Sequence, residues 1–528
     1  MKNYIFFTFF ILISCNTNNK EEKQIFRYNE HSNISSLDPA FARTQSNIWA
    51  VNQLFTGLVQ LDDSLNIKPD IAKSWDISPD GKTYTFLLRN DVYFHKNQCF
   101  TPDSTRKVTA KDFLYSFSRI NDEKTASPGK WIFQYINHFY AKNDSIFTIE
   151  LNHSFPPFLG LLATKYTSVV PKEAIDFYKE NFRRNPVGTG AFCFQLWEEN
   201  TKLILRKNPF FYEKENGTPL PYLDGIAITF LTEKQSEFLQ FIQGNLDFIN
   251  SIDASYKDEI LTPQGNLSDK YSDRIKMIKS PFLNTEYIGI TLDNVSDISE
   301  NEELRKAIHF GIDRKKMMKY LRNNIGIPAS NHFIPKGLEG FSEQKISYNP
   351  SYSQNIVNNF IHKHQRKPKI KIASDANYLD ICEFLQRELQ QIGFQCDIDI
   401  MLPSTLRQNR ALGKLETFRA SWIADYPDAE NYLSLFYSKN FAPNGGNYTH
   451  FQNNFYDNLY EKAINENSKE KRIILYQKMD SLIISHLPVI PLYYDENVRF
   501  IQKNIDGLSS NPINILQLKK VKKNPKNN

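Results

Sequence analysis

The sequence predicts a mixed α/β protein of two or three domains, and three observations lead to this prediction. The chain has 528 residues, 41% of them hydrophobic, which is too long for a single core. Residues 369–400 show a strand pattern, a helix pattern and a second strand pattern in succession. Residues 79–120 show a turn, a strand pattern and an amphipathic helix pattern.

The N-terminal segment "MKNYIFFTFFILISC" is typical of a secretory signal. Its apolar run, residues 4–13, is too short to span a bilayer as a helix but fits the apolar part of a signal peptide. "LISC" resembles a bacterial lipobox, which implies cleavage before Cys15 and lipid attachment to its thiol. The alternative is an ordinary signal peptide in which Cys15 is incidental. We expect residues 1–14 to be the signal and residues 15–24 to be a polar tether.

Residues 79–120 predict a turn, a strand and a helix. "PDG" at 79–81 favours a turn, and apolar side chains then alternate over residues 83–88, as in a strand. Thr109 is a candidate N-cap, and Asp112 three residues later suits a capping box. Apolar residues from 113 to 120 then recur on one helical face.

Residues 369–400 predict a βαβ-like unit. A strand over 369–373 leads into a helix with Cys382 and other apolar residues on one face, and Gly393 suits its C-cap. Residues 394–400 then alternate as a second strand, with Cys396 on the apolar side. The stretch 301–323 before this unit is helical in pattern. Such units are typical of α/β domains.

The charge balance argues against a nucleic-acid-binding protein. The formal net charge is +5, and the last ten residues, "KKVKKNPKNN", carry most of the excess. The rest of the chain is near neutral, whereas nucleic-acid binders carry a basic face on the folded body. We expect residues 519–528 to form a basic, disordered tail.

No motif in the chain supports catalysis, a metal site or a cofactor. There is no HExxH, no GxSxG and no phosphate-binding loop, and in "NPVGTGAFCF" Cys193 stands where a dinucleotide loop needs its third glycine. His362 and His364, in an expected loop, lack a third ligand nearby. Asp425 and Asp428 are too close in sequence for a glycosidase pair unless their loop folds back.

The cysteine pattern leaves the redox state open. Besides Cys15, the chain holds Cys99, Cys193, Cys382 and Cys396, and no two of them form a CxxC pair. An exported chain can oxidise two of these residues, but spacing does not select a pair. Cys382 and Cys396 lie on apolar faces, which favours buried free thiols.

Several segments, in this order, resemble one protein family: "SSLDPAFARTQSNIWAVNQLFTGLVQLD", "NPVGTGAF", "NTEYIGITLDN", "LRKAIHFGIDRKKMM", "WIADYPDAENYL" and "LPVIPLYYDENVRF". The family is that of the extracytoplasmic oligopeptide- and dipeptide-binding proteins of ABC importers, which also has nickel-, sugar- and haem-binding members. The resemblance runs from about residue 25 to residue 518. It implies a monomeric, lipid-anchored protein of the cell envelope that faces the periplasm or exterior and serves a membrane permease.

The resemblance also implies a two-lobed periplasmic-binding-protein fold with an extra α+β domain on the first lobe. The expected lobe I is discontinuous, with residues 25–69, 187–281 and 489–518. Residues 70–186 form the expected extra domain, and residues 282–488 form lobe II. Two lobes that close on a ligand bury it as neither lobe can alone.

In similar peptide binders, an aspartate three residues after a tryptophan pairs with the α-ammonium of the ligand. Asp425 after Trp422 matches this arrangement, with Trp422 as a wall of the pocket. A desolvated carboxylate forms a charge-assisted hydrogen bond with an ammonium. The alternative is that Asp425 caps the following turn. Asp428 and Glu430 suit the start of a helix and are interpreted as structural.

Other aromatic side chains are further candidates for the pocket, with a core position as the alternative for each. These residues are Tyr426, Tyr287, Tyr493, Tyr494 and Trp131. Because side chains alternate along a strand, we expect only one of the adjacent tyrosines 493 and 494 to face a cleft. Arg407 and Arg410 are candidate partners for a ligand carboxylate. The leading hypothesis is peptide capture; the alternatives are another solute of the same family or a surface hydrolase.

Overall fold

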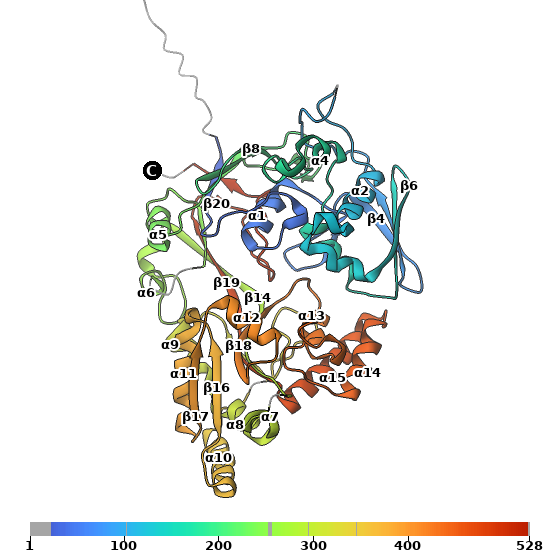
Figure 1. Ribbon diagram of the computed structural model, residues 1–528. Coiled ribbons are helices and arrows are strands. Elements are labelled where there is room, and N and C mark those ends of the chain that lie inside the picture. Colours follow the sequence, from blue (N-terminus) through green and yellow to red (C-terminus); the bar gives the residue numbers. More distant parts are fainter. Residues whose placement is uncertain (1–22, 102, 252–255, 294, 345, 526–528) are drawn as a thin grey trace, which may run out of the picture.

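The fold is organised around one large mixed sheet (Figure 1). The computed structural model describes residues 23–525, apart from residues 102, 252–255, 294 and 345. Within these residues, the sheet has eleven strands, of which β15 (Ile327–Pro328) pairs only with β19. The order of the others is β17 (Gln395–Ile400), β16 (Lys369–Ser374), β18 (Thr417–Ile423), β14 (Ile275–Ile290), β19 (Val489–Gln502), β13 (Phe248–Asn250), β1 (Ile25–Asn29), β12 (Gly225–Thr229), β9 (Lys202–Lys207) and β8 (Phe192–Glu198).

The two long strands β14 and β19 connect the two halves of the molecule (Figure 1). They pair antiparallel, and their register shifts between Pro281 and Thr285 and again between Glu286 and Tyr287. Such irregularities bend a strand pair and increase its twist. We call the part with β13, β1, β12, β9 and β8 the first half, and the part with β18, β16 and β17 the second half.

The first half also contains a separate four-stranded sheet, which lies within residues 70–186. Its strand order is β4 (Ala72–Ile77), β5 (Thr83–Leu88), β7 (Ile146–Leu151) and β6 (Ile136–Asn143). Buried residues of both sheets belong to one hydrophobic core, among them Phe26 and Phe86. The predicted strand at 83–88 is confirmed, as is the helix α2 (Ala110–Asn121) with its capping box of Thr109 and Asp112. The domain limits themselves stay predictions.

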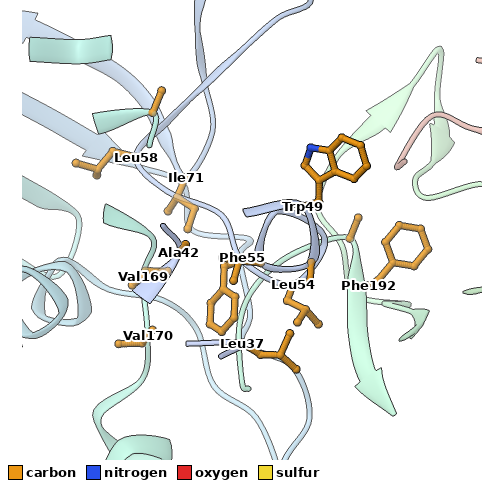
Figure 2. Packing of buried hydrophobic residues seen from close by; sticks show 14 of the residues in the cluster. Leu37, Ala42, Trp49, Leu54, Phe55, Leu58, Ile71, Val169, Val170 and Phe192 are labelled. Carbon is orange, nitrogen blue, oxygen red and sulfur yellow. The ribbon is translucent and has the colours of Figure 1, made fainter. Parts of the chain in front are cut away.

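Helix α1 (Gln45–Leu54) lies within this core. The Thr44 side chain caps it by accepting a hydrogen bond from the backbone N–H of Asn47. A turn before β8 packs against its end so closely that a Cβ on Gly188 would lie 2.1 Å from the carbonyl oxygen of Leu54. Figure 2 shows side chains from distant segments gathered here: Leu37, Leu54, Phe55, Ile71, Val169 and Phe192.

The second half contains the predicted βαβ unit. Strands β16 and β17 pair in parallel, and helix α11 (Leu379–Gln391) connects them. Cys382 and Cys396 are buried free thiols. The predicted helical stretch 301–323 is two helices, α8 (Glu302–Gly311) and α9 (Arg314–Arg322), with Asp313 as the N-cap of the second. These predictions are confirmed.

The remaining helices cover the sheets and their edges. They are α3 (Phe158–Leu162), α4 (Lys172–Tyr178), α5 (Lys234–Ile242), α6 (Lys257–Ile260), α7 (Asp297–Glu300), α10 (Pro350–His364), α12 (Pro403–Ala411), α13 (Glu430–Leu433), α14 (Asn454–Ile464) and α15 (Lys469–His486). His362 and His364 end α10, whereas we had expected a loop there. In the described part of the chain, no helix has the length and apolar character needed to cross a membrane.

The described residues include part of the expected C-terminal tail but none of the expected signal segment. Cys15 and the signal segment lie outside the described residues. At the other end, residues 519–525 differ from the expected disordered tail, because β21 (Lys522–Lys523) pairs with β20 (Ile505–Asp506). Lys519 Nζ lies 2.7 Å from a Glu213 carboxylate oxygen, and Lys523 Nζ lies 2.8 Å from one of Asp247. Partners elsewhere in the fold therefore hold these lysines.

Candidate functional site: a cavity between the two halves

A cavity of about 350 Å³ lies where the two halves meet. Segments from distant parts of the chain form its walls. They are residues 42–49 with Leu61, Trp131, residues 160–166, Phe282, residues 423–427 and residues 513–515. An inter-lobe cleft of this size is at the lower end of the range of about 300–1,000 Å³ that is typical of small-molecule sites.

Asp425 is the carboxylate of this cavity. Its side chain is exposed towards the cavity, while its backbone N–H donates a hydrogen bond of 3.2 Å to the side-chain oxygen of Asn431. The same oxygen accepts a hydrogen bond of 2.9 Å from the indole N–H of Trp422. Burial of the surrounding loop raises the pKa of Asp425, and the Asn431 side chain opposes this shift. Asn431 thus fixes the loop that presents the carboxylate.

Tyr426, the next residue, joins the loop to the first half. It is 4% exposed and belongs to the hydrophobic core of the first half. Its ring stacks on that of Trp131, with 6.3 Å between the centroids and 27° between the planes, and packs edge-on against Phe155. Trp131 also lines the cavity, and a ligand contact by its ring stays a prediction. Tyr426 therefore lies in the core, which was the alternative to a position in the pocket.

Asp428 and Glu430 do not line the cavity. Asp428 accepts hydrogen bonds of 2.9 Å from the Glu430 backbone N–H and 2.7 Å from the Tyr476 hydroxyl. Glu430 is buried and accepts hydrogen bonds from the hydroxyls of Tyr426 and Tyr460. Burial raises the pKa of Glu430 to about 7. These contacts fit the structural role predicted for both residues and do not pair Asp425 with Asp428 in one cavity.

The other three candidate tyrosines lie in the protein core. Tyr287 packs edge-on against Phe333 at 5.2 Å between centroids. Tyr493 lies under the guanidinium of Arg322, and the Tyr494 hydroxyl donates a hydrogen bond of 2.8 Å to a backbone carbonyl. Each tyrosine is at most 3% exposed, and none lines the cavity. The predicted ligand contacts of these residues therefore gain no support from the structure.

Trp422 and the candidate arginines also lie away from the cavity wall. Trp422 is half-buried and packs on the core of the second half, so its neighbours in the chain, not its ring, contact the cavity. Arg407 is exposed on α12. The Arg410 guanidinium stacks on Tyr448 at 4.3 Å from the ring centroid.

The cavity also contains charged and polar groups that were not predicted. Arg43, Lys165 and Tyr166 line it. Burial raises the pKa of Tyr166 to about 12, with Arg43 lowering it and Asp425 raising it. The charges of Arg43 and Asp425 therefore both act on the Tyr166 hydroxyl. Lys165 and Tyr166 lie outside the segments that carry the family resemblance, and Arg43 lies within one of them, in which the sequence alone did not single it out.

A second cavity of about 340 Å³ adjoins the first. The two share four lining residues: Gln45, Phe282, Ile423 and Asn514. The space between the halves thus continues past Phe282 towards the β14–β19 pair. Among the described residues, no group of three or more His, Cys, Asp or Glu side chains is arranged to hold a metal ion.

Comparison with known proteins identifies the family. A model described as bacterial extracellular solute-binding proteins, family 5 middle, matches residues 66–444. The chain is 25% identical over 533 residues to the probable deoxycholate-binding periplasmic protein YgiS of Escherichia coli, covering 92% of this chain and 90% of that protein. It is 22% identical over 561 residues to the dipeptide-binding protein DppE of Bacillus subtilis, covering 98% and 97%.

Solved structures share the fold. HbpA2 from Haemophilus parasuis superposes with a TM-score of 0.82 at 20% identity, covering 95% of this chain and all of that one. DppA from Helicobacter pylori, in complex with the peptide STSA, superposes with a TM-score of 0.77 at 23% identity, covering 95% and 98%. The predicted two-lobed α/β fold is thereby confirmed. Because the family model spans most of the chain, the protein belongs to family 5 of the bacterial extracellular solute-binding proteins.

Proposed function

We propose that this protein is a lipid-anchored receptor that captures short peptides between its lobes and delivers them to the permease of an ABC importer. The observation that carries the proposal is the position of Asp425, a carboxylate exposed to a cavity that both halves line. Burial raises the pKa of Asp425, and the hydrogen bond with the Asn431 side chain opposes this shift, so a bound cation would stabilise the charged form further. A peptide α-ammonium supplies that cation through a charge-assisted hydrogen bond.

The domain arrangement in this proposal follows the predicted limits. Residues 25–69, 187–281 and 489–518 form lobe I, residues 70–186 form the extra domain, and residues 282–488 form lobe II. The lobes close about the irregular β14–β19 pair. Closure buries the ligand against walls from both lobes, as expected for small solutes in this kind of fold.

Two relatives support a peptide, and others support a different solute. DppE is named as a dipeptide-binding protein, and the DppA structure contains a bound peptide. YgiS is named as a probable deoxycholate-binding protein, and another relative, from Haemophilus influenzae, as a heme-binding protein. The peptide proposal is favoured because deoxycholate and haem carry no ammonium for Asp425 to bind.

A double-mutant cycle tests the proposal. Asp425→Asn keeps the shape of the side chain and removes its charge, so a bound ammonium loses its partner at a cost of roughly 2–5 kcal/mol. This corresponds to a loss in affinity of about 30-fold to several thousand-fold. N-acetylation of the peptide should weaken binding to the wild type similarly and should cost the Asn variant much less.

Calorimetry on the four combinations of protein and peptide gives the result. Asp428→Asn is the matched control, because Asp428 bonds within the protein and does not line the cavity. It should leave peptide affinity within a few-fold of the wild type. If acetylation costs the same with Asp or Asn at position 425, the carboxylate does not bind the ammonium, and the observation that carries the peptide proposal fails. A binding protein also leaves the masses of all added peptides unchanged, whereas a hydrolase shortens them.

The anchor is tested separately. Two or more acyl chains hold a protein stably at a membrane, whereas one gives marginal binding. Cys15→Ser should therefore move the protein from the membrane fraction to the soluble fraction. A variant that still sediments with membranes would overturn the lipid anchor without affecting the peptide proposal.

A further inference from the structure

A further cavity lies within the second half, away from the space between the two halves. Its volume is about 500 Å³, and it forms where the start of α9, the edge strand β15 and Tyr494 of β19 come together. It shares no lining residue with the two cavities between the halves. We call it the α9 cavity. The peptide proposal gives it no role.

Most of the wall of the α9 cavity is apolar. Ile312 and Ala329 are buried there, and Ile327 and Phe341 are half-buried. The Phe341 ring packs edge-on against the Tyr494 ring, with 5.7 Å between the centroids. The Tyr494 hydroxyl already donates a hydrogen bond to a backbone carbonyl, so this residue offers the cavity mainly apolar surface. Such a wall suits the apolar body of a small ligand.

Arg314 places a buried cation on the same wall. It is 4% exposed, and its Nε and Nη1 donate hydrogen bonds of 2.7 and 2.8 Å to the carbonyls of Pro491 and His309. Its Nη2 has no partner, and among the described residues no carboxylate forms an ion pair with this guanidinium. Burial lowers the pKa of Arg314 to about 10, opposed only by Tyr494, so the group stays charged at neutral pH. A buried charge without a counter-ion is costly, and an anion beside it offsets part of that cost.

The two carboxylates that line the cavity are already engaged. Asp313 caps α9 by accepting a hydrogen bond of 2.9 Å from the Lys316 backbone N–H, and Glu343 lies 3.2 Å from Lys336 Nζ. Lys315, by contrast, is exposed in the first turn of α9, where the helix dipole also favours negative charge. The cavity therefore combines an apolar wall with positive charge that its own carboxylates do not neutralise.

We infer that the α9 cavity is a second ligand site, which binds a small amphipathic carboxylate with an unbranched apolar chain of about ten carbons. The carboxylate lies at the end formed by Arg314 and Lys315, and the chain packs along Ile327, Phe341 and Tyr494. A guanidinium and an ammonium both form charge-assisted hydrogen bonds with a carboxylate. This inference is independent of the peptide proposal, because the two sites share no residue.

Three probes measured by calorimetry on the purified protein separate the contributions of charge and chain. Decanoate should bind saturably, one molecule per protein. Hexanoate keeps the carboxylate but lacks four methylene groups, each of which strengthens binding roughly fourfold when buried, so it should bind about 50- to 200-fold more weakly. Decylamine keeps the chain and reverses the charge, and it should bind at least about tenfold more weakly than decanoate.

Variants assign decanoate binding to this cavity. Lys315→Glu should weaken it about 5- to 20-fold. Lys319→Glu is the matched control, because Lys319 is also exposed on α9 but does not line the cavity, and it should bind decanoate as the wild type does. Phe341→Ala should weaken decanoate about tenfold and leave the preference over decylamine unchanged. These variants leave Arg314 and its two backbone contacts in place, so they do not depend on replacing a buried residue.

Lys165→Met tests the competing location, because Lys165 lines the cavity between the halves. If this variant loses decanoate affinity while Lys315→Glu does not, decanoate occupies the other cavity and the inference is refuted. It is equally refuted if decanoate does not bind, if decylamine binds as tightly, or if Lys319→Glu weakens binding as much as Lys315→Glu. Peptide capture through Asp425 is measured with its own peptides, so these outcomes leave it untouched.

Discussion

We predict that Asn431 positions Asp425, the carboxylate proposed to bind the ligand ammonium. Replacing Asn431 tests this prediction. The side-chain oxygen of Asn431, which is 4% exposed, accepts hydrogen bonds from the Trp422 indole and from the Asp425 backbone. Asn431→Ala leaves both donors without an acceptor. Residue 425 remains an aspartate in this variant, so the variant alters the position of the carboxylate in space and not its chemistry.

The expected magnitude follows from these two bonds. Each buried donor left unsatisfied costs about 1–3 kcal/mol, and the Trp422 indole is at the low end because its ring is half-buried. Together we expect a loss of about 2–4 kcal/mol in the free energy of unfolding of the second half. The freed loop should also lower peptide affinity by about tenfold, because a small displacement of the Asp425 carboxylate weakens its interaction with the ligand ammonium. This loss is smaller than that expected for Asp425→Asn.

Asn447 provides a matched control in the same half. It is fully buried, accepts and donates hydrogen bonds over 2.9–3.2 Å, and lines no part of the cavity. Asn447→Ala should cost at least as much stability in denaturation experiments, yet leave peptide affinity near that of the wild type. If Asn431→Ala binds as tightly as the wild type, or if Asn447→Ala loses as much affinity, the positioning role is refuted.

Three further predictions concern stability. Gly188→Ala should cost about 1–3 kcal/mol of unfolding free energy because its Cβ would overlap the Leu54 carbonyl, whereas Gly57→Ala, with its nearest contact at 3.7 Å, should cost less; equal costs would contradict the packing argument. Glu430 has a pKa raised to about 7, so the stability linked to its protonated form is complete below about pH 4.5 and is lost as pH rises to about 7. Glu430→Gln should therefore gain about 3 kcal/mol relative to the wild type over that interval in denaturation titrations, and a pH-independent difference would refute this. His95, whose ring nitrogens both bond to the backbone of the turn before β8, has a pKa lowered by burial to about 4. The wild type should lose stability as pH falls from about 6.5 to 4, and His95→Asn, although less stable at pH 7, should show a weaker dependence in thermal denaturation; equal slopes would refute it.

Local patterns made much of the fold predictable. The unit at 369–400 has alternating strand residues, one apolar helix face and Gly393, whose φ of +107° requires the residue that the sequence supplies. The same holds for α2, where Thr109 and Asp112 form the predicted capping box. Each of these signals lies within a few residues of the structure that it specifies.

Alternation failed where a strand is covered on both faces. In β19, nearly every residue is buried, so the rule that one of Tyr493 and Tyr494 faces a cleft does not apply. Both rings lie in the core, one under Arg322 and the other bonded to a backbone carbonyl. Period-two patterns show which residues share a face, but not what covers that face.

The cations that line the cavity could not be predicted for a different reason. No local pattern singles out Arg43 or Lys165, and tertiary packing between segments far apart in the sequence brings both to the cavity that Asp425 lines. The lysines of residues 519–525 show the same limit, because their partners Glu213 and Asp247 lie far away in sequence. Charge counted along the sequence does not reveal which charges are paired.

The loop after β18 places a cavity-lining residue directly beside a residue that joins the two halves. Asp425 faces the cavity, while Tyr426, the next residue, is buried in the core of the first half and stacks on Trp131. Asn431 fixes the same loop from the second half. Opening the lobes would expose Tyr426 and withdraw Asp425 from the other walls in one movement. The hydrophobic contact of Tyr426 therefore favours the closed arrangement, in which Asp425 faces a cavity lined by both halves.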